Sequence, residues 1–310
     1  MTINNNSDIQ KNIGSVIDAA KKTGCGVLEN ELLSKYTTFK IGGAASAVIE
    51  VGSVSALCEL YALCTRLGVP CMVIGNGSNL LVSDDGYEGV VFRLTGELRA
   101  VSSLDENTIK CGAALTLAKL CKYALDHSLS GLEFAWGIPG SVGGAAFMNA
   151  GAYGGEMKDV IESVSYVSPD GKCGTIPAEK LGLSYRHSIF AERPGIITSV
   201  TVKLHHDDKA LIQDRMNDFM DRRRTKQPLE FPSAGSVFKR PEGFFAGGLI
   251  EECGLKGRQI GGAQVSEKHA GFIVNKGGAT CKDVSDLVKL IQDTVLSEKG
   301  VSLECEIRRV

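Results

Sequence analysis

Residues 131–155, GLEFAWGIPGSVGGAAFMNAGAYGG, decide the fold of this chain. Eight of these 25 residues are glycine, and Glu133 is the only charged one. Because surface loops are normally polar, a long stretch this small and apolar indicates packing against a large surface. That surface is either other backbone, or a flat ligand that the glycine backbone approaches closely. The stretch by itself leaves both interpretations open.

A second glycine-rich stretch, IGNGSNLL at 74–81, directly follows a strand predicted over 70–75. Glycine and small polar residues let successive backbone N–H groups form a concavity that binds phosphate oxygens. The stretch is not a G-x-G-x-x-G fingerprint, because Leu80 takes the place of the third glycine, and no Lys-Ser/Thr follows as in a Walker A loop. An ordinary turn between strands is the alternative.

Working outward, apolar periodicity predicts six helices and several strands in an α+β arrangement. The helices are predicted over 8–23, 54–67, 115–128, 207–224, 246–253 and 282–299. Strands or hairpins are predicted at 47–51, 70–75, 97–112, 163–177, 195–206, 260–275 and 302–310, and 225–243 is predicted as a loop. The predicted borders give four ranges, 1–92, 93–206, 207–303 and 304–310.

Composition excludes several classes of protein. Of 310 residues, 43% are hydrophobic and 23% charged, which is typical of globular domains, and the net charge of −2 argues against a nucleic-acid binder. We find no signal-peptide pattern and no apolar run long enough to span a membrane, so we expect a cytoplasmic protein without membrane insertion. The ten cysteines form no C-x-x-C pair, so we expect reduced, mostly buried thiols and no metal site.

Seven segments together resemble one family, the UDP-N-acetylenolpyruvoylglucosamine reductases. They are TTFKIGG (37–43), GNGSNLL (75–81), the tract 131–156, SYRHSIF (184–190), SAGSVFKRP (233–241), 249–275 and LECEIR (303–308). They follow the family's order and span nearly the whole chain. The resemblance implies a vanillyl-alcohol-oxidase-type FAD-binding fold in two subdomains, 1–92 and 93–206. An α+β substrate-binding domain, 207–303, and a C-terminal strand, 304–310, with a catalytic glutamate would follow.

The resemblance also implies a cofactor, non-covalently bound FAD. Its pyrophosphate and flavin would contact the two glycine-rich stretches, in agreement with the interpretation of those stretches as an anion-binding loop and a surface for a flat group. The implied FAD contacts are Gly75, Asn76, Gly77, Ser78, Asn79, Leu80, Gly137, Ile138, Pro139, Gly140, Ser141, Gly143, Gly144 and Ala145.

The implied reaction is the NADPH-dependent reduction of UDP-N-acetylglucosamine enolpyruvate to UDP-N-acetylmuramate, a peptidoglycan precursor. Hydride addition at C3 leaves negative charge at C2, so the site needs a proton donor at C2 and charge stabilisation at the carboxylate. The resemblance assigns the proton to Ser236. Serine is a weak acid, and Lys239 is a candidate to stabilise its alkoxide. Without the resemblance, Ser236 would be interpreted as a capping hydroxyl.

Arg186 and Glu306 are the other two residues that the resemblance places at the reaction. A guanidinium matches a planar carboxylate with two parallel hydrogen bonds, which lysine cannot do. A carboxyl group at Glu306 helps beside an enolate only when it is protonated or hydrogen-bonded. Glu304 would share the face of Glu306 on a strand. Taken alone, Arg186 reads as a surface ion-pair partner and His187 as a packed or solvated histidine.

Seven residues are candidates for contacts with the diphosphate-bearing substrate: Tyr185, Arg222, Lys226, Gln227, Lys239, Arg240 and Gln259. The basic run at 222–226 ends a predicted helix, so a solvated helix end is its alternative. Some relatives carry FKNP where this chain has FKRP, and the inserted tyrosine-bearing segment of one branch is missing. The chain thus resembles the shorter type II branch, and the residue that closes over the uridine diphosphate is not identified. We expect a monomer or weak dimer.

Two other functions compete with this hypothesis. One is an oxygen-using oxidase, or another reductase, with the same FAD fold. Many such oxidases attach flavin covalently through His or Cys, and no histidine occurs near 75–81. The other is a non-catalytic protein that binds a nucleotide sugar.

Overall fold

The computed structural model describes residues 6–310, and the chain divides into two compact units. Unit 1 comprises residues up to 31 together with 46–76 and 88–221, and unit 2 comprises 32–45, 77–87 and 222–310. The chain passes from unit 1 to unit 2 inside the GNGSN motif, after Asn76. The four linear ranges predicted as domains stay a prediction.

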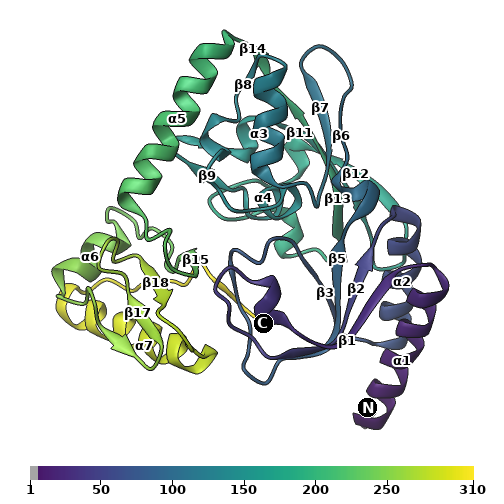
Figure 1. Cartoon of the computed structure of the whole chain (residues 1–310), viewed down its shortest axis with the longest axis horizontal. Coiled ribbons are helices and arrows are strands. Elements are labelled where there is room, and N and C mark those ends of the chain that lie inside the picture. The colour runs from purple at the N-terminus through teal and green to yellow at the C-terminus, as the bar shows by residue number, and fades with distance from the viewer. Residues whose placement is uncertain (1–5) are drawn as a thin grey trace. The chain divides into compact units, whose positions relative to one another are not determined.

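The first sheet of unit 1 has the order β1-β2-β5-β3, with β3 parallel to β5. Its strands are β1 (Gly26–Leu32), β2 (Ala44–Val51), β3 (Cys71–Ile74) and β5 (Tyr87–Leu94). The helices α1 (Asn6–Lys22) and α2 (Val54–Leu67) lie side by side (Figure 1). The predicted helix over 54–67 is confirmed as α2: Ser53 caps it and Gly68 ends it, with a φ of 65° that suits glycine.

The second sheet of unit 1 has the order β12-β11-β13-β7-β6, and every neighbouring pair is antiparallel. The predicted segments 97–112 and 163–177 each form an antiparallel pair of strands, β6 with β7 and β11 with β12. The strands are β6 (Val101–Ser103), β7 (Thr108–Gly112), β11 (Ile161–Val167), β12 (Cys173–Pro177) and β13 (Ile196–Lys203). The helices are α3 (Leu117–Asp126), α4 (Val142–Met148) and α5 (Lys209–Lys226), and the short strands are β8 (Leu129–Ser130), β9 (Gly151–Ala152), β10 (Gly155–Glu156) and β14 (His205–His206).

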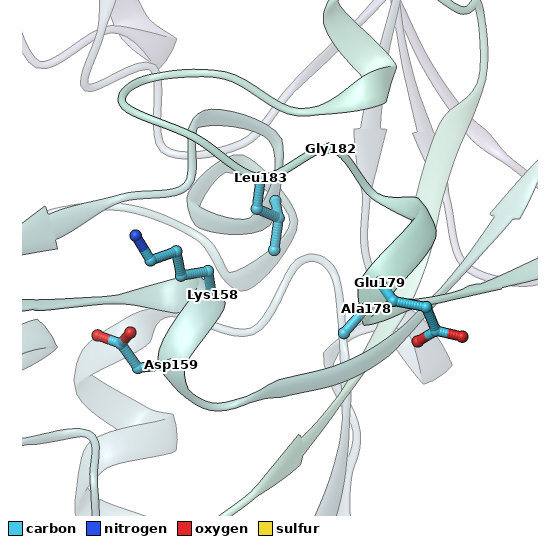
Figure 2. A pocket seen from close by; sticks show the side chains of 6 residues that line it. All are labelled: Lys158, Asp159, Ala178, Glu179, Gly182 and Leu183. Carbon is cyan, nitrogen blue, oxygen red and sulfur yellow. The ribbon is translucent and has the colours of Figure 1, made fainter.

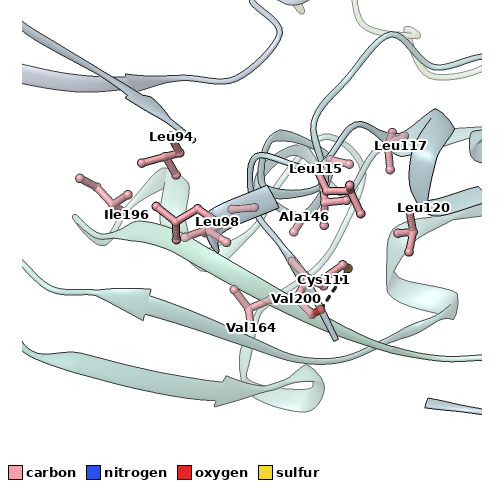
Figure 3. Close-up of a cluster of buried hydrophobic side chains, with 14 of the residues drawn as sticks. Leu94, Leu98, Cys111, Leu115, Leu117, Leu120, Ala146, Val164, Ile196 and Val200 are labelled. Atoms are coloured by element: carbon pink, nitrogen blue, oxygen red, sulfur yellow. Dashed lines mark hydrogen bonds between the residues drawn. The ribbon is translucent and has the colours of Figure 1, made fainter. Parts of the chain in front are cut away.

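One hydrophobic core lies wholly within unit 1. Figure 3 shows part of it, with Leu115, Ala146 and Val200 among the buried side chains. The buried Cys111 thiol donates to the carbonyl of Val200 at 3.2 Å. The cysteines are free, as expected, but Cys173 is exposed, so the prediction of burial holds for only part of the set.

Unit 2 is built on an antiparallel sheet of order β15-β18-β17-β16. Its elements are β4 (Leu80–Leu81), β15 (Ser233–Ser236), α6 (Ala246–Glu252), β16 (Gln259–Ile260), β17 (Ala263–Val265), β18 (Phe272–Asn275), α7 (Cys281–Lys299) and β19 (Arg308–Arg309). All three of its chain segments contribute to its core, because Phe39, Ile41 and Leu81 join Leu287 and Ile291 there.

Three predictions of local structure are wrong. The strand predicted over 302–310 shrinks to Arg308–Arg309, because the segment hydrogen-bonds first to 237–239 and then to Asn79 instead of forming one ladder. The predicted loop 225–243 contains β15. The glycine tract contains α4, which its helix-weakening glycines concealed. In the described part of the chain, no helix combines the length and apolarity needed to cross a bilayer.

Candidate active site

In unit 1, the start of the GNGSN loop lies against residues 139–141 of the glycine tract. A side chain on Gly75 would collide with the Ser141 hydroxyl, so only glycine fits there. The Asn76 side-chain amide donates to the carbonyl of Pro139 at 3.3 Å. The two stretches that the sequence predicts for one cofactor are therefore adjacent in space.

Backbone hydrogen bonds fix the start of α4. Ser141 is buried, and its hydroxyl accepts from the N–H of Gly144 at 3.2 Å. The N–H of Val142 donates to Leu115 O at 2.8 Å, and that of Gly143 to Ala113 O at 2.8 Å. These bonds give the glycine tract one defined path.

Some glycines of the tract serve packing. A Cβ on Gly143 would lie 2.7 Å from the Cβ of Ala113, and one on Gly155 would lie 2.7 Å from Phe134 Cδ1. At these two positions the interpretation as close packing within the protein is right. Gly144, in contrast, is exposed, and Gly140 has ordinary side-chain neighbours at 3.6 Å or beyond. Gly140 and Gly144 therefore leave room for a ligand.

In unit 2, the second half of the same loop presents two backbone donors. Gly77 is buried with a φ of 59°, and a side chain there would collide with the carbonyl of Tyr36. The carbonyl of Gly77 accepts from the N–H of Thr38 at 3.2 Å. Within residues 6–310, the N–H groups of Gly77 and Ser78 find no acceptor. Two adjacent unsatisfied amides at a left-handed glycine suit a bound anion such as a pyrophosphate.

Unit 2 also brings Ser236 and Glu306 together. The N–H of Glu306 donates to the carbonyl of Val237, next to Ser236, at 2.7 Å. Asn79 donates through its side-chain amide to the carbonyl of Glu306 at 3.1 Å. Ser236 ends β15 opposite Phe272 of β18, and its hydroxyl donates to Phe238 O at 3.2 Å. Both predicted catalytic side chains are half-buried on hydrogen-bonded backbone.

The ammonium of Lys239 pairs with the exposed carboxylate of Glu304. The charge of Lys239 is thus directed to Glu304, and no contact between Lys239 and Ser236 supports the predicted stabilisation of a Ser236 alkoxide. Gly271 lies near the side chains of both His269 and Ser236. A Cβ on Gly271 would lie 3.1 Å from His269 Nδ1 and 3.6 Å from Ser236 Oγ.

His269 is a residue that sequence reasoning missed. Its Nδ1 accepts from the N–H of Gly271 at 3.1 Å, so the neutral ring carries its proton on Nε2. Burial lowers the pKa of the His269 imidazole, which keeps the ring neutral. His269 lies inside the quoted segment 249–275, but no role was assigned to it, because only the pairing of β15 with β18 brings Ser236 opposite Phe272, three residues beyond His269.

Arg186 belongs to unit 1 and sits at the tip of a tight turn. The N–H of Ser184 donates to His187 O at 3.2 Å, and the N–H of His187 returns to Ser184 O at 3.1 Å. Arg186 has a φ of 55°, and its guanidinium lies 5.1 Å from the centre of the exposed Tyr185 ring. The ring of His187 contacts Gly182 O and Glu192, as expected of a packed histidine.

A cavity of about 500 Å³ opens beside this turn (Figure 2). It is lined by Lys158, Asp159, Ala178, Glu179, Gly182 and Leu183. None of the predicted site residues is among these six. Lys158 pairs with Glu156, so its charge is already compensated.

Six of the seven candidate substrate contacts belong to unit 2, and Tyr185 belongs to unit 1. Arg222 and Lys226 are in the last turns of α5, and the N–H of Gln227 donates to Arg223 O at 2.9 Å. The Arg240 guanidinium lies 4.0 Å from the centre of the Phe245 ring, which is 66% exposed. Gln259 donates to Gly261 O at 2.8 Å. Residues 6–310 contain no cluster of three His, Cys, Asp or Glu side chains placed to hold a metal ion.

Comparison with known proteins relates both parts of the chain to described families. Residues 45–176 match the model of an FAD-binding domain, and residues 227–310 match the C-terminal domain of UDP-N-acetylenolpyruvoylglucosamine reductase. The reductase of Syntrophomonas wolfei is 47% identical over 281 residues, which cover 91% of this chain and 94% of that protein. A Clostridium botulinum reductase is 48% identical over 284 residues, 91% and 92% of the two chains.

A solved structure agrees with these matches. The crystal structure of UDP-N-acetylenolpyruvylglucosamine reductase from Thermus caldophilus aligns with a TM-score of 0.79 at 40% identity. The alignment covers 92% of this chain and 98% of that one. The predicted fold class, an α+β chain with an FAD-binding domain followed by a further domain, is confirmed.

Proposed function

Because this chain belongs to the UDP-N-acetylenolpyruvoylglucosamine reductase family of FAD-dependent oxidoreductases, we propose that it reduces UDP-N-acetylglucosamine enolpyruvate to UDP-N-acetylmuramate with NADPH. The observation that carries the proposal beyond family membership is the hydrogen bond, 2.7 Å long, that joins the backbone of Glu306 to Val237 beside Ser236. This bond supports a single proton-donating site that contains Ser236 of SAGSV and Glu306 of ECEIR.

The chain offers a donor set that fits FAD. The N–H groups of Gly77, which is buried, and Ser78, which is half-buried, would hold the pyrophosphate, since neither donates to an acceptor within residues 6–310. The remaining loop residues, Gly75, Asn76, Asn79 and Leu80, and the tract 137–145 would line the cofactor without a covalent bond. Bound by these residues, FAD would supply the hydride-transfer chemistry between NADPH and C3 of the enolpyruvyl group.

Ser236 donates the proton to C2 in this proposal. Arg186 binds the enolpyruvyl carboxylate and stabilises the charge that develops on it. Glu306 holds a proton or a hydrogen bond at the same place, where an uncompensated carboxylate would repel the substrate. The His269 ring, which lies near Gly271 as Ser236 does, is neutral and would supply no positive charge there.

The substrate's diphosphate is met by local cations, since the net charge of the whole chain is −2. Arg222, Lys226 and Gln227 supply donors at the end of α5, where a cation also complements the helix dipole. Tyr185, Lys239, Arg240 and Gln259 are the further proposed contacts. The enzyme would act as a monomer or weak dimer in the cytoplasm, in peptidoglycan precursor synthesis.

The decisive experiment follows the flavin spectrum of the purified protein. We expect oxidised flavin absorbance, its bleaching by NADPH without air, and its return when the enolpyruvyl sugar nucleotide is added. Return only with oxygen, together with peroxide, would indicate an oxidase instead. A colourless protein that still binds the sugar nucleotide would indicate a non-catalytic binding protein.

The Ser236→Ala variant tests the proton donor. We expect unchanged bleaching by NADPH and reoxidation by substrate slowed about a hundredfold or more. Ser233→Ala, in the same short strand, is the matched control and should reoxidise at the normal rate. Equal slowing of both half-reactions in Ser236→Ala would contradict a role in protonation.

A further inference from the structure

We propose that Asn149 and Ser188 are positioning residues that fix the turn carrying Arg186 to the end of α4. The inference rests on the role proposed above for Arg186, but the contacts that carry it are independent of that role. Both residues lie inside quoted segments, Asn149 in 131–156 and Ser188 in 184–190, but the sequence assigned neither of them a role.

Asn149 forms the first connection. It caps the C-terminal end of α4 with a φ of 43°, and it is 1% exposed. Its Nδ2 donates to the carbonyl of Ser184 at 3.0 Å and to Glu156 Oε2 at 2.6 Å, and its Oδ1 accepts from the N–H of Lys158 at 2.8 Å. Both amide protons and the oxygen are used, so this buried side chain has one favourable orientation.

Ser188 forms the second connection, on the other side of the turn. It is fully buried, and its hydroxyl donates to the carbonyl of Phe147 at 2.7 Å. Phe147 and Asn149 bracket the end of α4, and Ser184 and Ser188 bracket Tyr185 and Arg186. The turn is therefore attached to the helix at both ends.

The backbone of Arg186 shows why such attachment matters. Arg186 and Asn149 have φ values of 55° and 43°, in the left-handed region that non-glycine residues seldom adopt. Each such conformation costs on the order of 1 kcal/mol and persists where the surroundings determine it. The hydrogen bonds of Asn149 and Ser188, together with the two that close the turn, hold the backbone of Arg186 in this conformation.

The arrangement connects two parts of the proposed site. Helix α4 is capped by Ser141 and contains Gly144, two of the proposed cofactor contacts, and it ends at the residues that hold the Arg186 turn. Loosening the turn should leave the cofactor stretch intact while the guanidinium samples several positions. Since a displacement of about 1 Å can cost about a hundredfold in rate, the loss belongs to the half-reaction with the enolpyruvyl substrate.

Asn149→Gly and Ser188→Ala test the proposal in the FAD-loaded protein. Glycine retains access to the left-handed conformation at 149, and alanine at 188 removes one hydroxyl. We expect bleaching by NADPH within about twofold of normal and reoxidation by substrate about ten- to a hundredfold slower. Ser165→Ala, which removes the hydroxyl bonded to Thr175 at 3.1 Å on β11, is the control and should change neither rate.

Combination with Arg186→Ala separates positioning from a general structural role. If Asn149 acts through Arg186, adding Asn149→Gly to Arg186→Ala slows reoxidation little further. Full additivity of the two losses would overturn the proposal, and so would equal slowing of both half-reactions by Asn149→Gly or Ser188→Ala.

Limited trypsin digestion gives a readout that does not depend on the reaction. Trypsin cleaves after arginine, so peptides ending at Arg186 report opening of the turn. We expect them to appear several times faster in Asn149→Gly and Ser188→Ala, but not in Ser165→Ala. If Arg186→Ala left reoxidation unchanged, the proposed role of Arg186 would fail while this result still tested the attachment. Unchanged cleavage in both variants would overturn the attachment itself.

Discussion

At the scale of single residues, Glu304 and Glu306 show how neighbours in sequence acquire different environments. Their segment pairs with 237–239 through one antiparallel bridge, between Cys305 and Phe238, and the prediction that the two side chains share one face stays a prediction. Glu304 is 72% exposed and pairs with Lys239. Glu306 is half-buried, and its backbone is held from both sides by Val237 and Asn79. Only Glu306 therefore has the fixed placement that a reactive carboxyl group needs.

The pair provides its own matched test. Glu306→Gln should slow reoxidation of the flavin by the enolpyruvyl substrate about a hundredfold, because an ionisable group is lost at the reacting carbon. Glu304→Gln removes an exposed ion pair worth about 1 kcal/mol or less and should leave that rate unchanged. Stopped-flow absorbance measures both. Similar losses in the two variants would point to the charge of the segment and not to Glu306.

The thiol of Cys58 supports a second prediction at this scale. Burial, together with the Cys173 thiol 3.6 Å away, raises the pKa of Cys58 to about 11. The thiolate is the reactive form, and an exposed thiol, with a pKa of about 8.5, levels off in reactivity about one pH unit above that value. In a Cys173→Ser variant, alkylation of Cys58 should still accelerate beyond that pH, because burial remains. Mass spectrometry of the Cys58 peptide measures the rate. A plateau at the pH of an exposed thiol would contradict the effect of burial.

At the scale of elements, α5 is held by charge more than by apolar contact. Ile212 and Met216 are its buried residues, and Arg215 reaches off the helix. Its guanidinium donates to Glu133 at 2.9 and 3.0 Å and to Asp207 at 2.6 Å. Burial by itself would raise the pKa of Glu133, but the backbone, Ser130 and Arg215 donors lower it below its usual value.

Removing Arg215 should therefore destabilise unit 1. Arg215→Met leaves the buried Glu133 carboxylate without its cation, at a cost of about 3 kcal/mol near neutral pH, measured by urea unfolding. Because the folded pKa of Glu133 is depressed, its contribution is complete above the unfolded value of about 4.3 and is lost as the pH falls through the folded pKa. The difference between variant and parent should thus shrink in acid.

Lys209→Met is the control for that measurement. It removes an exposed ion pair with Asp126, 3.4 Å long, on the same helix, and should cost about 0.5 kcal/mol or less. A cost as large as that of Arg215→Met would show that any lost cation on α5 has the same effect.

At the scale of the whole molecule, two hydrophobic cores divide the chain in a way that its linear order does not. Unit 2 needs residues from 32–45 and 77–87 as well as 222–310. Phe39, which is fully buried, also accepts from the buried Asn275 amide at 3.1 Å. The family's C-terminal model begins at residue 227 and so covers only part of this unit.

A fragment of residues 222–310 should therefore fold poorly by itself. It lacks Phe39, whose loss from a core typically costs about 3–5 kcal/mol, together with Ile41, Leu81 and the β4 partner of β19. Circular dichroism and amide exchange should show weak, non-cooperative structure. The Phe39→Ala variant of the full chain loses the same side chain and should remain folded. A cooperative, well-protected fragment would contradict the assignment of these segments to unit 2.

Sequence by itself determined the fold class, the main helices and hairpins, the two glycine-rich segments and the family, because each rests on local periodicity or on a contiguous motif. The tertiary structure decided what sequence left open or got wrong: that Gly143 and Gly155 serve packing, that 302–310 is no regular strand, and that β18, which follows His269, pairs with the strand that ends at Ser236. It also decided the roles of Asn149 and Ser188. The physical reason is separation along the chain. Ser188 bonds a carbonyl 41 residues away, and Asn79 bonds Glu306 across 227 residues, so these partners exist only after the chain has folded.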